Sequence, residues 1–297
     1  MASLIDIRRR LRSVKSTQQI TKAMKMVAAA KLRRAQERVI GARPYAKSIA
    51  DLLASVRKRL GPAAAHPLLA SREERRVIVV VVAGDRGLCG AFNTNVHRAT
   101  ANLIAAHPEW QEIRILPIGK KAVEFWRRRK YALTEKTYPG LFNDLRYDHA
   151  REIAGFLSAE FLAEKIDVAY VVVNEFRSIL SQVVHAGRIL PLAAPAETEP
   201  VAKDAEKAAP AGVEPLFEPS LAAILAWLVP RFLEFTVYRA LAESAAAEMG
   251  ARMTAMDSAS KNAGELIDSL TLTYNRARQA RITKELIEIV SGAAALG

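Results

Sequence analysis

The chain has 297 residues, of which 51% are hydrophobic and 25% charged, a composition that fits one large or two modest globular domains and excludes disorder throughout. Its one cysteine, Cys89, excludes an internal disulfide and fits a reducing compartment. The longest apolar runs, Val77 to Ala83 and Leu221 to Val229, are much shorter than the roughly 20 residues that span a bilayer. The basic start also lacks the apolar stretch of a signal peptide, so we expect any membrane association to go through partners.

The net charge of +13 is concentrated at one end of the sequence. Residues 1–60 hold sixteen of the 44 basic residues but only three of the 31 acidic ones, which leaves 28 of each sign in the rest of the chain. A cationic helix of this kind is typical of proteins that bind nucleic acid, an anionic membrane surface or an acidic protein. Charge alone leaves these three alternatives open.

Residues 1–60 have the composition of one long helix. Ala, Lys, Arg, Leu, Gln and Met dominate, and the segment contains a single glycine, Gly41, and a single proline, Pro44. The apolar residues that recur at spacings of three and four are Ile7, Leu11, Val14, Ile20, Met24 and Val27. One step of six, between Val14 and Ile20, interrupts them, which indicates an apolar stripe with a stutter. Such a helix would extend roughly 80 Å at 1.5 Å per residue, so most of it needs a partner.

Residues 75–192 change to short β-branched runs that alternate with helical stretches, which is an α/β pattern. We predict strands at 76–83, 113–118, 168–174 and 183–190, and helices near 94–106, 120–129 and 149–164. The sheet should be mostly parallel, with the last two strands forming a hairpin because too few residues separate them for a crossover helix. Residues 193–215, rich in Ala, Pro, Glu and Lys, predict a solvated linker of little functional importance.

Residues 220–297 again consist mainly of helix formers, with a long amphipathic pattern. The apolar positions that repeat mostly at three- and four-residue spacing are Leu241, Met249, Met253, Met256, Ala263, Leu266, Ile267, Leu270, Tyr274, Ala277, Ile282, Leu286 and Ile289. This spacing predicts a second long helix packed along the first, so that the two ends of the chain form an antiparallel coiled coil. Small residues in its middle, including Gly250 and Gly264, would let the two backbones approach closely.

The segment Gly84 to Gly90, between a predicted strand and a predicted helix, is the best candidate for a phosphate-binding loop. It matches neither the dinucleotide fingerprint nor the Walker motif, so a structural turn is the favoured interpretation over a nucleotide-dependent enzyme. Cys89, beside Arg86, is interpreted as a buried structural cysteine rather than a reactive thiol. The five histidines have no metal-ligand spacing and no Ser/His/Asp pattern is visible, so we expect no catalytic site, cofactor or metal.

A basic cluster near the start keeps a nucleic-acid interpretation open. Its residues, Arg8, Arg9, Arg10, Arg12 and Lys15, could bind phosphates. No recognised nucleic-acid module is visible, however, and residues 1–44 contain no aromatic residue that could stack on bases. For any one of these arginines, a solvated helix face is as good an explanation as a specific anionic partner. A basic coiled-coil nucleic-acid-binding protein is therefore the alternative function.

Several separated motifs resemble, in the right order, the gamma subunits of F-type ATP synthases. They are Ser16 to Lys31, Asp85 to Phe92, Phe217 to Pro219, Ala251 to Met256, Asn262 to Leu266, Tyr274 to Ala280, Ile282 to Glu285 and Glu288 to Ala295. The resemblance covers nearly the whole chain apart from 193–215. It implies an α/β fold with long terminal helices, in which an antiparallel two-helix coiled coil (1–60 with 220–297) accompanies a central Rossmann-like domain (75–192).

By this resemblance, the chain would be the central rotor shaft of the F1 sector, standing inside a hexamer of three alpha and three beta subunits. Its foot would rest on the membrane c-ring beside the epsilon subunit, at the cytoplasmic face of the bacterial inner membrane. Proton flow would turn the ring and the shaft, which shifts each beta subunit in turn through binding, synthesis and release of ATP without touching the substrate itself. Nucleic acid is not an expected partner.

The resemblance also implies roles for particular residues. Met24, Arg252, Gln279 and Thr283 would contact beta subunits, and Glu218 would lie near the c-ring and epsilon. The tip of the C-terminal helix would form an apolar bearing in the hexamer from Ser291, Gly292, Ala293, Ala294 and Ala295. The excess positive charge would face acidic loops of the beta subunits, and each exposed ion pair would contribute roughly 0 to 1 kcal/mol, too little to hold the shaft at one angle.

Overall fold

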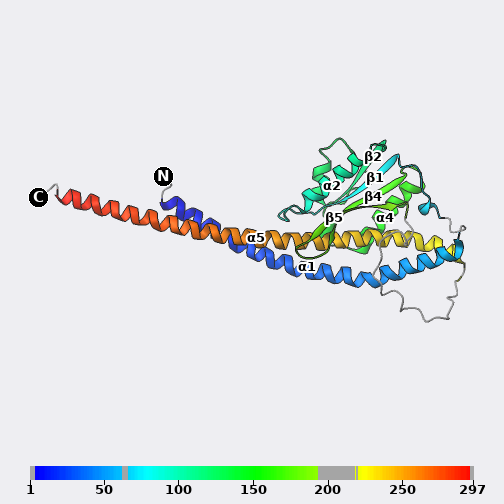
Figure 1. The fold of residues 1–297 in the computed structure, drawn as a ribbon, viewed down its shortest axis with the longest axis horizontal. Coiled ribbons are helices and arrows are strands. Elements are labelled where there is room, and N and C mark those ends of the chain that lie inside the picture. Colours follow the sequence, from blue (N-terminus) through cyan, green and yellow to red (C-terminus); the bar gives the residue numbers. More distant parts are fainter. Residues whose placement is uncertain (1–3, 62–65, 193–217, 219, 295–297) are drawn as a thin grey trace. The chain divides into compact units, whose positions relative to one another are not determined.

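The computed structural model describes residues 4–61, 66–192, 218 and 220–294 (Figure 1). The elements are, in chain order, α1 (Leu4–Leu60), η2 (Pro67–Leu69), β1 (Arg76–Val82), α2 (Phe92–Ala106), β2 (Glu112–Ile118), α3 (Lys120–Trp126), β3 (Ala132–Leu133), η3 (Leu141–Asn143), α4 (Tyr147–Leu162), β4 (Val168–Phe176), β5 (Gln182–Leu190) and α5 (Leu221–Ala294). The predicted linker, 193–215, lies outside the described residues.

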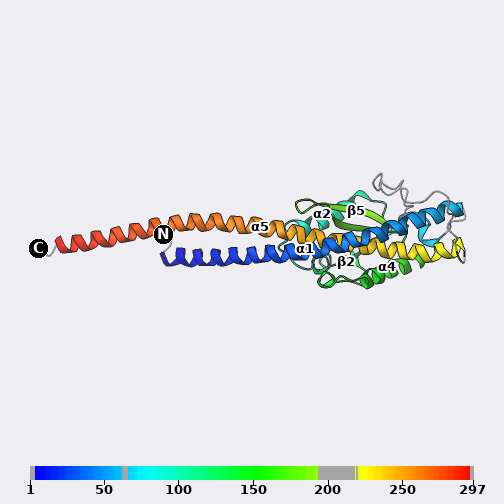
Figure 2. The same cartoon turned by 90° about the horizontal axis from the view of Figure 1, so that it is seen from below.

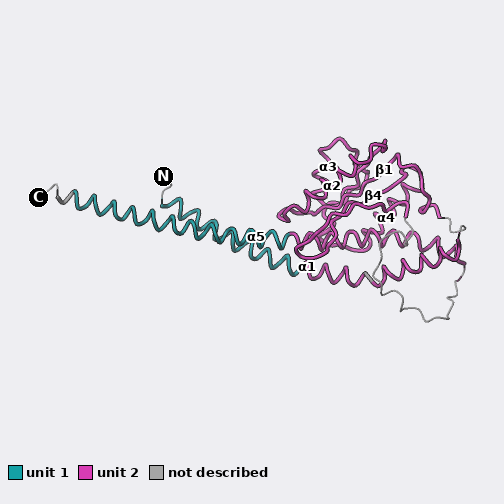
Figure 3. The backbone as a smooth tube through the Cα atoms, in the orientation of Figure 1, with its two compact units in different colours: residues 1–30, 252–297 teal, residues 31–251 magenta. Residues whose placement is uncertain are grey.

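The chain divides into two compact units (Figure 3). The first consists of residues 1–30 and 252–297, and the second of residues 31–251. Both long helices therefore contribute to both units, because the boundary crosses α1 after residue 30 and α5 before residue 252.

The second unit contains one five-stranded sheet with the strand order β3-β2-β1-β4-β5. Strand β1 pairs in parallel with both β2 and β4, whereas β4 and β5 form an antiparallel hairpin, which confirms the predicted arrangement. The sequence did not predict β3, which is two residues long and pairs in parallel with β2. So short a strand leaves no alternation of polar and apolar residues to recognise.

Helices cover both faces of this sheet (Figures 1 and 2). The side chains of Ile78, Val80 and Val82 pack into a core with residues of α1, α4 and α5. Those of Val77 and Val79, which point the other way, pack with residues of α2 and α3. Because β1 is buried on both faces, its apolar run is continuous rather than alternating.

The predicted helix ends differ from the observed ones by a few residues. Helix α2 begins at Phe92 and α4 at Tyr147, two residues earlier than expected in each case. Helix α3 ends at Trp126 rather than near Arg129, because the chain turns there toward β3. The predicted helix interior at 127–129 is therefore an exposed turn.

By length and composition alone, the part of α5 from Leu221 to Ser291 could cross a membrane. Its most apolar stretch has a mean hydropathy of 1.5. A single helix of this kind is a weak indication, since the core helix of a soluble protein passes the same test. In the second unit, Leu228, Val229 and Leu233 of this helix are completely buried in the core below the sheet. Uninterrupted apolar runs alone did not reveal this property of α5.

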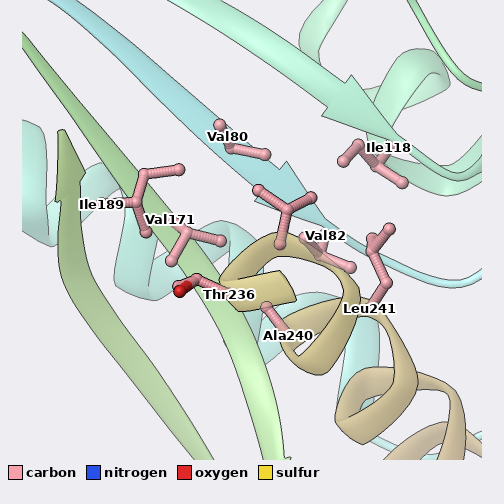
Figure 4. Close-up of a pocket in the computed structure, with 9 residues that line it drawn as sticks. Val80, Val82, Ile118, Val171, Ile189, Thr236, Ala240 and Leu241 are labelled. Carbon is pink, nitrogen blue, oxygen red and sulfur yellow. The ribbon is translucent and has the colours of Figure 1, made fainter. Parts of the chain in front are cut away.

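A small apolar cavity lies between the sheet and α5 (Figure 4). It is lined by Val80, Val82, Ile118, Val171, Ile189, Thr236, Val237, Ala240 and Leu241. Its volume of about 10 Å³ accommodates one water molecule at most. The hydroxyl of Thr236 already donates to the carbonyl of Phe232 at 2.8 Å, so this cavity is a packing gap and not a ligand site.

Candidate functional site

In the first unit, the less exposed residues of α1 repeat every seven positions. One set is Ile7, Val14, Thr21 and Ala28, and the other is Leu4, Leu11, Gln18 and Lys25. This is the heptad spacing of a two-helix seam, and the predicted stutter is wrong. Ile20 and Val27, which the apolar pattern assigned to the seam, are each 56% exposed. Apolarity was misleading here because polar side chains occupy the inner positions.

Two polar seam residues of α1, Gln18 and Lys25, have partners on α5. Lys25 Nζ lies 2.6 Å from Asp257 Oδ1, and Lys261 Nζ lies 3.2 Å from the other carboxylate oxygen of Asp257. The hydrogen bond from Lys25, followed by that from Lys261, lowers the pKa of Asp257 below its ordinary value. The amide of Gln18 donates to the carbonyl of Ser260 at 3.4 Å. These contacts confirm that the two ends of the chain pair as antiparallel helices.

Gly264 allows this close approach of the two helices. A Cβ atom at position 264 would lie 3.1 Å from Gln18 Nε2, closer than ordinary van der Waals contact. Together with the Lys25–Asp257 pair, this contact sets the register, since Gln18 precedes Lys25 by seven residues and Gly264 follows Asp257 by seven. Continuing the same register by fourteen residues places Leu4, where α1 begins, level with Arg278.

Helix α5 continues beyond that level to Ala294, and its side chains from Gln279 to Ser291 are exposed. Ile282 is 49% exposed, Leu286 56% and Ile289 67%. The prediction that these three residues pack in the intramolecular seam is therefore wrong, because the described part of α1 ends before their level. Neighbouring charges are satisfied along α5 itself, where Arg281 pairs with Glu285 at 2.7 Å. This segment is an apolar helix surface that the described residues of the chain leave uncovered.

The residues expected to contact beta subunits occupy different environments. Met24 is half-buried beside the seam, and Arg252 is 8% exposed. Gln279 and Thr283 are exposed and lie one turn apart on α5, past the level of Leu4. The structure therefore separates these four residues along the helix pair and does not gather them into one pocket.

The remaining expected site residues lie at two other places. Ser291 is exposed on the last turns of α5, and Gly292, Ala293 and Ala294 belong to the same helix. Ala295 lies outside the described residues. Glu218 belongs to the second unit, just before α5, and is exposed.

In the second unit, the turn after β1 is held by an acidic side chain. Asp85 Oδ1 accepts hydrogen bonds from the backbone N–H groups of Lys120 at 2.9 Å and Gly140 at 2.7 Å. Its Oδ2 accepts from the N–H of Phe142 at 3.0 Å. The carboxyl ends of β1 and β2 are where open α/β folds bind phosphates, and here the carboxylate of Asp85 takes up these donors itself. The turn is therefore structural, as the sequence favoured.

Two glycines allow the backbone to close up around this turn. Gly119 has a φ of 90°, and a Cβ atom there would lie 1.9 Å from the carbonyl oxygen of Ala83. A Cβ atom on Gly84 would lie 2.9 Å from the carboxyl carbon of Glu248 on α5, so this helix covers the turn. Cys89 is 2% exposed and packs with Phe92, which confirms its burial. Sequence reasoning missed the role of Asp85, since its only local signal is an acidic residue three positions after the end of a buried strand.

Known proteins match the chain over its whole length. A family model described as ATP synthase matches residues 3–296. The chain is 48% identical over 297 residues to the ATP synthase gamma chain of Pelotomaculum thermopropionicum, with 100% of both chains covered. The chain belongs to the ATP synthase gamma chain family. It is also 49% identical over 296 residues to the gamma chain of Desulforamulus reducens, again with 100% of both chains covered.

Solved structures agree on the fold. A chain of the Euglena gracilis mitochondrial ATP synthase in a rotational state matches with a TM-score of 0.62 and 21% identity, covering 99% of this chain and 94% of the other. A chain of the central stalk and c-ring of the Tetrahymena thermophila enzyme matches with a TM-score of 0.58 and 24% identity, covering 81% and 99%. The chain is thus a subunit of a membrane-associated ATP synthase complex, and the comparisons give the nucleic-acid alternative no support.

Proposed function

We propose that the chain is the central rotor shaft of the F1 sector, which transmits torque between a proton-driven c-ring and a catalytic hexamer of alpha and beta subunits. The observation that carries the proposal is the single helix α5, which pairs with α1 through polar contacts such as Lys25–Asp257. It then continues past the level of Leu4 as a helix with exposed apolar side chains. An apolar helix end that the described residues leave uncovered needs a partner to remove its surface from water.

Different parts of the shaft have different partners in this proposal. Met24, Gln279 and Thr283 contact beta subunits, with Arg252 supporting the same region, and Ser291 to Ala295 form the bearing at the tip. The exposed basic residues of α1 face acidic loops of the beta subunits. Glu218 and the start of α5 contact the c-ring and the epsilon subunit. Residues 75–192 form the central domain, and 193–215 serve as a linker.

The proposal also assigns the chain a location and excludes chemistry of its own. It lies at the cytoplasmic face of the bacterial inner membrane as a peripheral subunit, and the burial of Leu228 and Leu233 in the core argues against a role for α5 as a membrane span. The nucleotide chemistry belongs to its neighbours. The bonds that Asp85 makes to three backbone N–H groups support this view, because they take the donors that a bound phosphate would need.

Copurification tests this function. The chain, tagged and expressed in its native membrane, should be recovered with alpha and beta subunits in a complex that couples ATP hydrolysis to proton pumping. Recovery of the folded chain without either subunit would refute the proposal. Recovery with nucleic acid that persists at physiological salt would instead favour the alternative function.

A substitution at Met24 tests the coupling role of the helix pair. Met24→Lys adds a cation to a half-buried position beside Lys25, at the proposed contact with the beta subunits. We expect fewer protons pumped per ATP hydrolysed, with the ATPase rate less affected. Thr17→Lys places the same charge on an exposed position of the same helix and serves as the matched control. Equal pumping ratios in the two variants would contradict the proposed contact.

A further inference from the structure

The layer formed by α2 and α3 is strongly cationic, although charge outside residues 1–60 balances in the sequence as a whole. Seven basic residues lie in α2, α3 and the turn 127–130, against one acidic residue, Glu124. The basic residues are Arg98, Lys120, Lys121, Arg127, Arg128, Arg129 and Lys130, and we call their surface the cationic face. Six of the seven are exposed, and Lys121 is partly exposed.

The two helices belong to one continuous surface. The ring of His97 on α2 stacks on that of Phe125 on α3, with centroids 4.0 Å apart and planes 2° from parallel. This layer covers the side of the sheet opposite α4 and α5 (Figures 1 and 2). The cationic face is therefore a feature of the tertiary structure that brings together residues from 98 to 130.

Local helix electrostatics do not account for these charges. Cations after the C-terminus of α3 complement its dipole, but Lys120 and Lys121 stand in its first turn, where the dipole disfavours them. Among the described residues, Lys121 has an ion pair with Glu124 at 2.7 Å, whereas Arg127 to Lys130 have no ion pair. The acidic residues between the helices in sequence are engaged elsewhere, since Glu112 pairs with Arg114 and Glu109 with His107.

Two of the cationic groups rest on aromatic rings. The Arg129 guanidinium carbon lies 4.0 Å from the centroid of Phe125, and Lys130 Nζ lies 5.6 Å from that of Tyr131. Contacts of this kind restrict the side chains before any partner arrives and reduce the entropy that binding costs. The charges are thus partly pre-organised on the surface.

We propose that the cationic face is a docking surface for an acidic face of another protein, separate from the contacts of the helix pair. Four of its seven cations are arginines, whose planar guanidinium groups bind carboxylates through two parallel hydrogen bonds. An anionic membrane is disfavoured, because none of the described residues 92–131 is a large apolar residue with its side chain exposed for insertion among lipids. Exposed charges of one sign give a fast, salt-sensitive association with a surface of the opposite sign.

Photocrosslinking in intact cells tests this inference. A photoreactive amino acid replaces Arg128 in the full chain, the cells are illuminated, and the crosslinked peptides are identified after purification under denaturing conditions. We expect crosslinks to a protein segment with a clear excess of Asp and Glu. Crosslinks mainly to lipid or nucleic acid, crosslinks to segments without acidic excess, or no crosslinks would each overturn the proposal.

Charge reversal provides the second arm. Arg127→Glu with Lys130→Glu, in the chain that carries the crosslinker, should lower the crosslink yield about tenfold, because opposite charges then become like charges. The matched control is Arg151→Glu with Lys165→Glu, which makes the same charge change around α4, where both cations are already paired with acids. Equal yields in the two variants would overturn the proposal. The result is independent of copurification with alpha and beta subunits, so this inference and the proposed function can fail separately.

Discussion

Replacing Asp85 should loosen the turn after β1 in a way that depends on the chemistry of the replacement. The carboxylate accepts three backbone N–H bonds, of 2.9, 2.7 and 3.0 Å. Each hydrogen bond to a charged group contributes about 1.5 to 3 kcal/mol, and water can replace part of it at a half-buried site. For Asp85→Ala we therefore expect a loss of about 3 to 5 kcal/mol in the local opening free energy.

Asp85→Asn should lose less, roughly 1 to 2 kcal/mol. The amide oxygen can keep the two bonds that Oδ1 accepts, from Lys120 and Gly140, although they become weaker without the charge. The amide nitrogen cannot accept the bond from Phe142, because two donors would then face each other. The order of effects, with alanine worse than asparagine, follows directly from these three contacts.

Amide hydrogen exchange of the purified full chain measures these losses at the three N–H groups. The acidic side chain of Asp144 provides the control, since it is 72% exposed and pairs with Arg146 at 3.4 Å. Asp144→Asn should change exchange at Lys120, Gly140 and Phe142 by less than about 0.5 kcal/mol. Unchanged exchange at these amides in Asp85→Ala, or equal effects of alanine and asparagine, would refute this account of the turn.

Two further predictions concern the packing of the second unit. Gly119→Ala should destabilise this unit by more than about 3 kcal/mol in urea denaturation, because the new methyl group meets the Ala83 carbonyl at a positive φ. Gly155→Ala, on the open face of α4, is the control and should be neutral or stabilising. Burial, and then the nearby Arg129 guanidinium, lower the pKa of His97 from 6.5 to about 4. Between these two pH values the unfolded chain binds a proton that the folded chain does not. The free energy of unfolding should therefore decrease by up to about 3 kcal/mol as the pH is lowered from 6.5 to 4. His97→Met should remove that part of the decrease. A pH dependence identical in the wild-type chain and the His97→Met variant would contradict this assignment, as equal stability of the two glycine variants would contradict the first.

The amino-acid sequence by itself determined the class of fold and the family. Continuous β-branched runs and their separations were enough to predict the parallel strands and the β4–β5 hairpin, because burial on both faces and chain reach constrain these features locally. Motifs from Ser16 to Ala295 were enough to recognise the family, which the full-length relatives confirm. Helix composition predicted α1 and α5 nearly to their ends.

Only the tertiary structure decided which residues face each other. The seam of the helix pair is lined by Gln18, Thr21 and Lys25, and a search for apolar periodicity misses these polar residues. The hydrogen-bond partners of Gln18 and Lys25 lie more than 200 residues away in the sequence. Asp85 likewise meets its donors from two distant loops, and the cations of α2 and α3 form one face only when the helices pack together. A polar group is stable inside a protein when its partner is present, and a partner distant in sequence is located only by the fold.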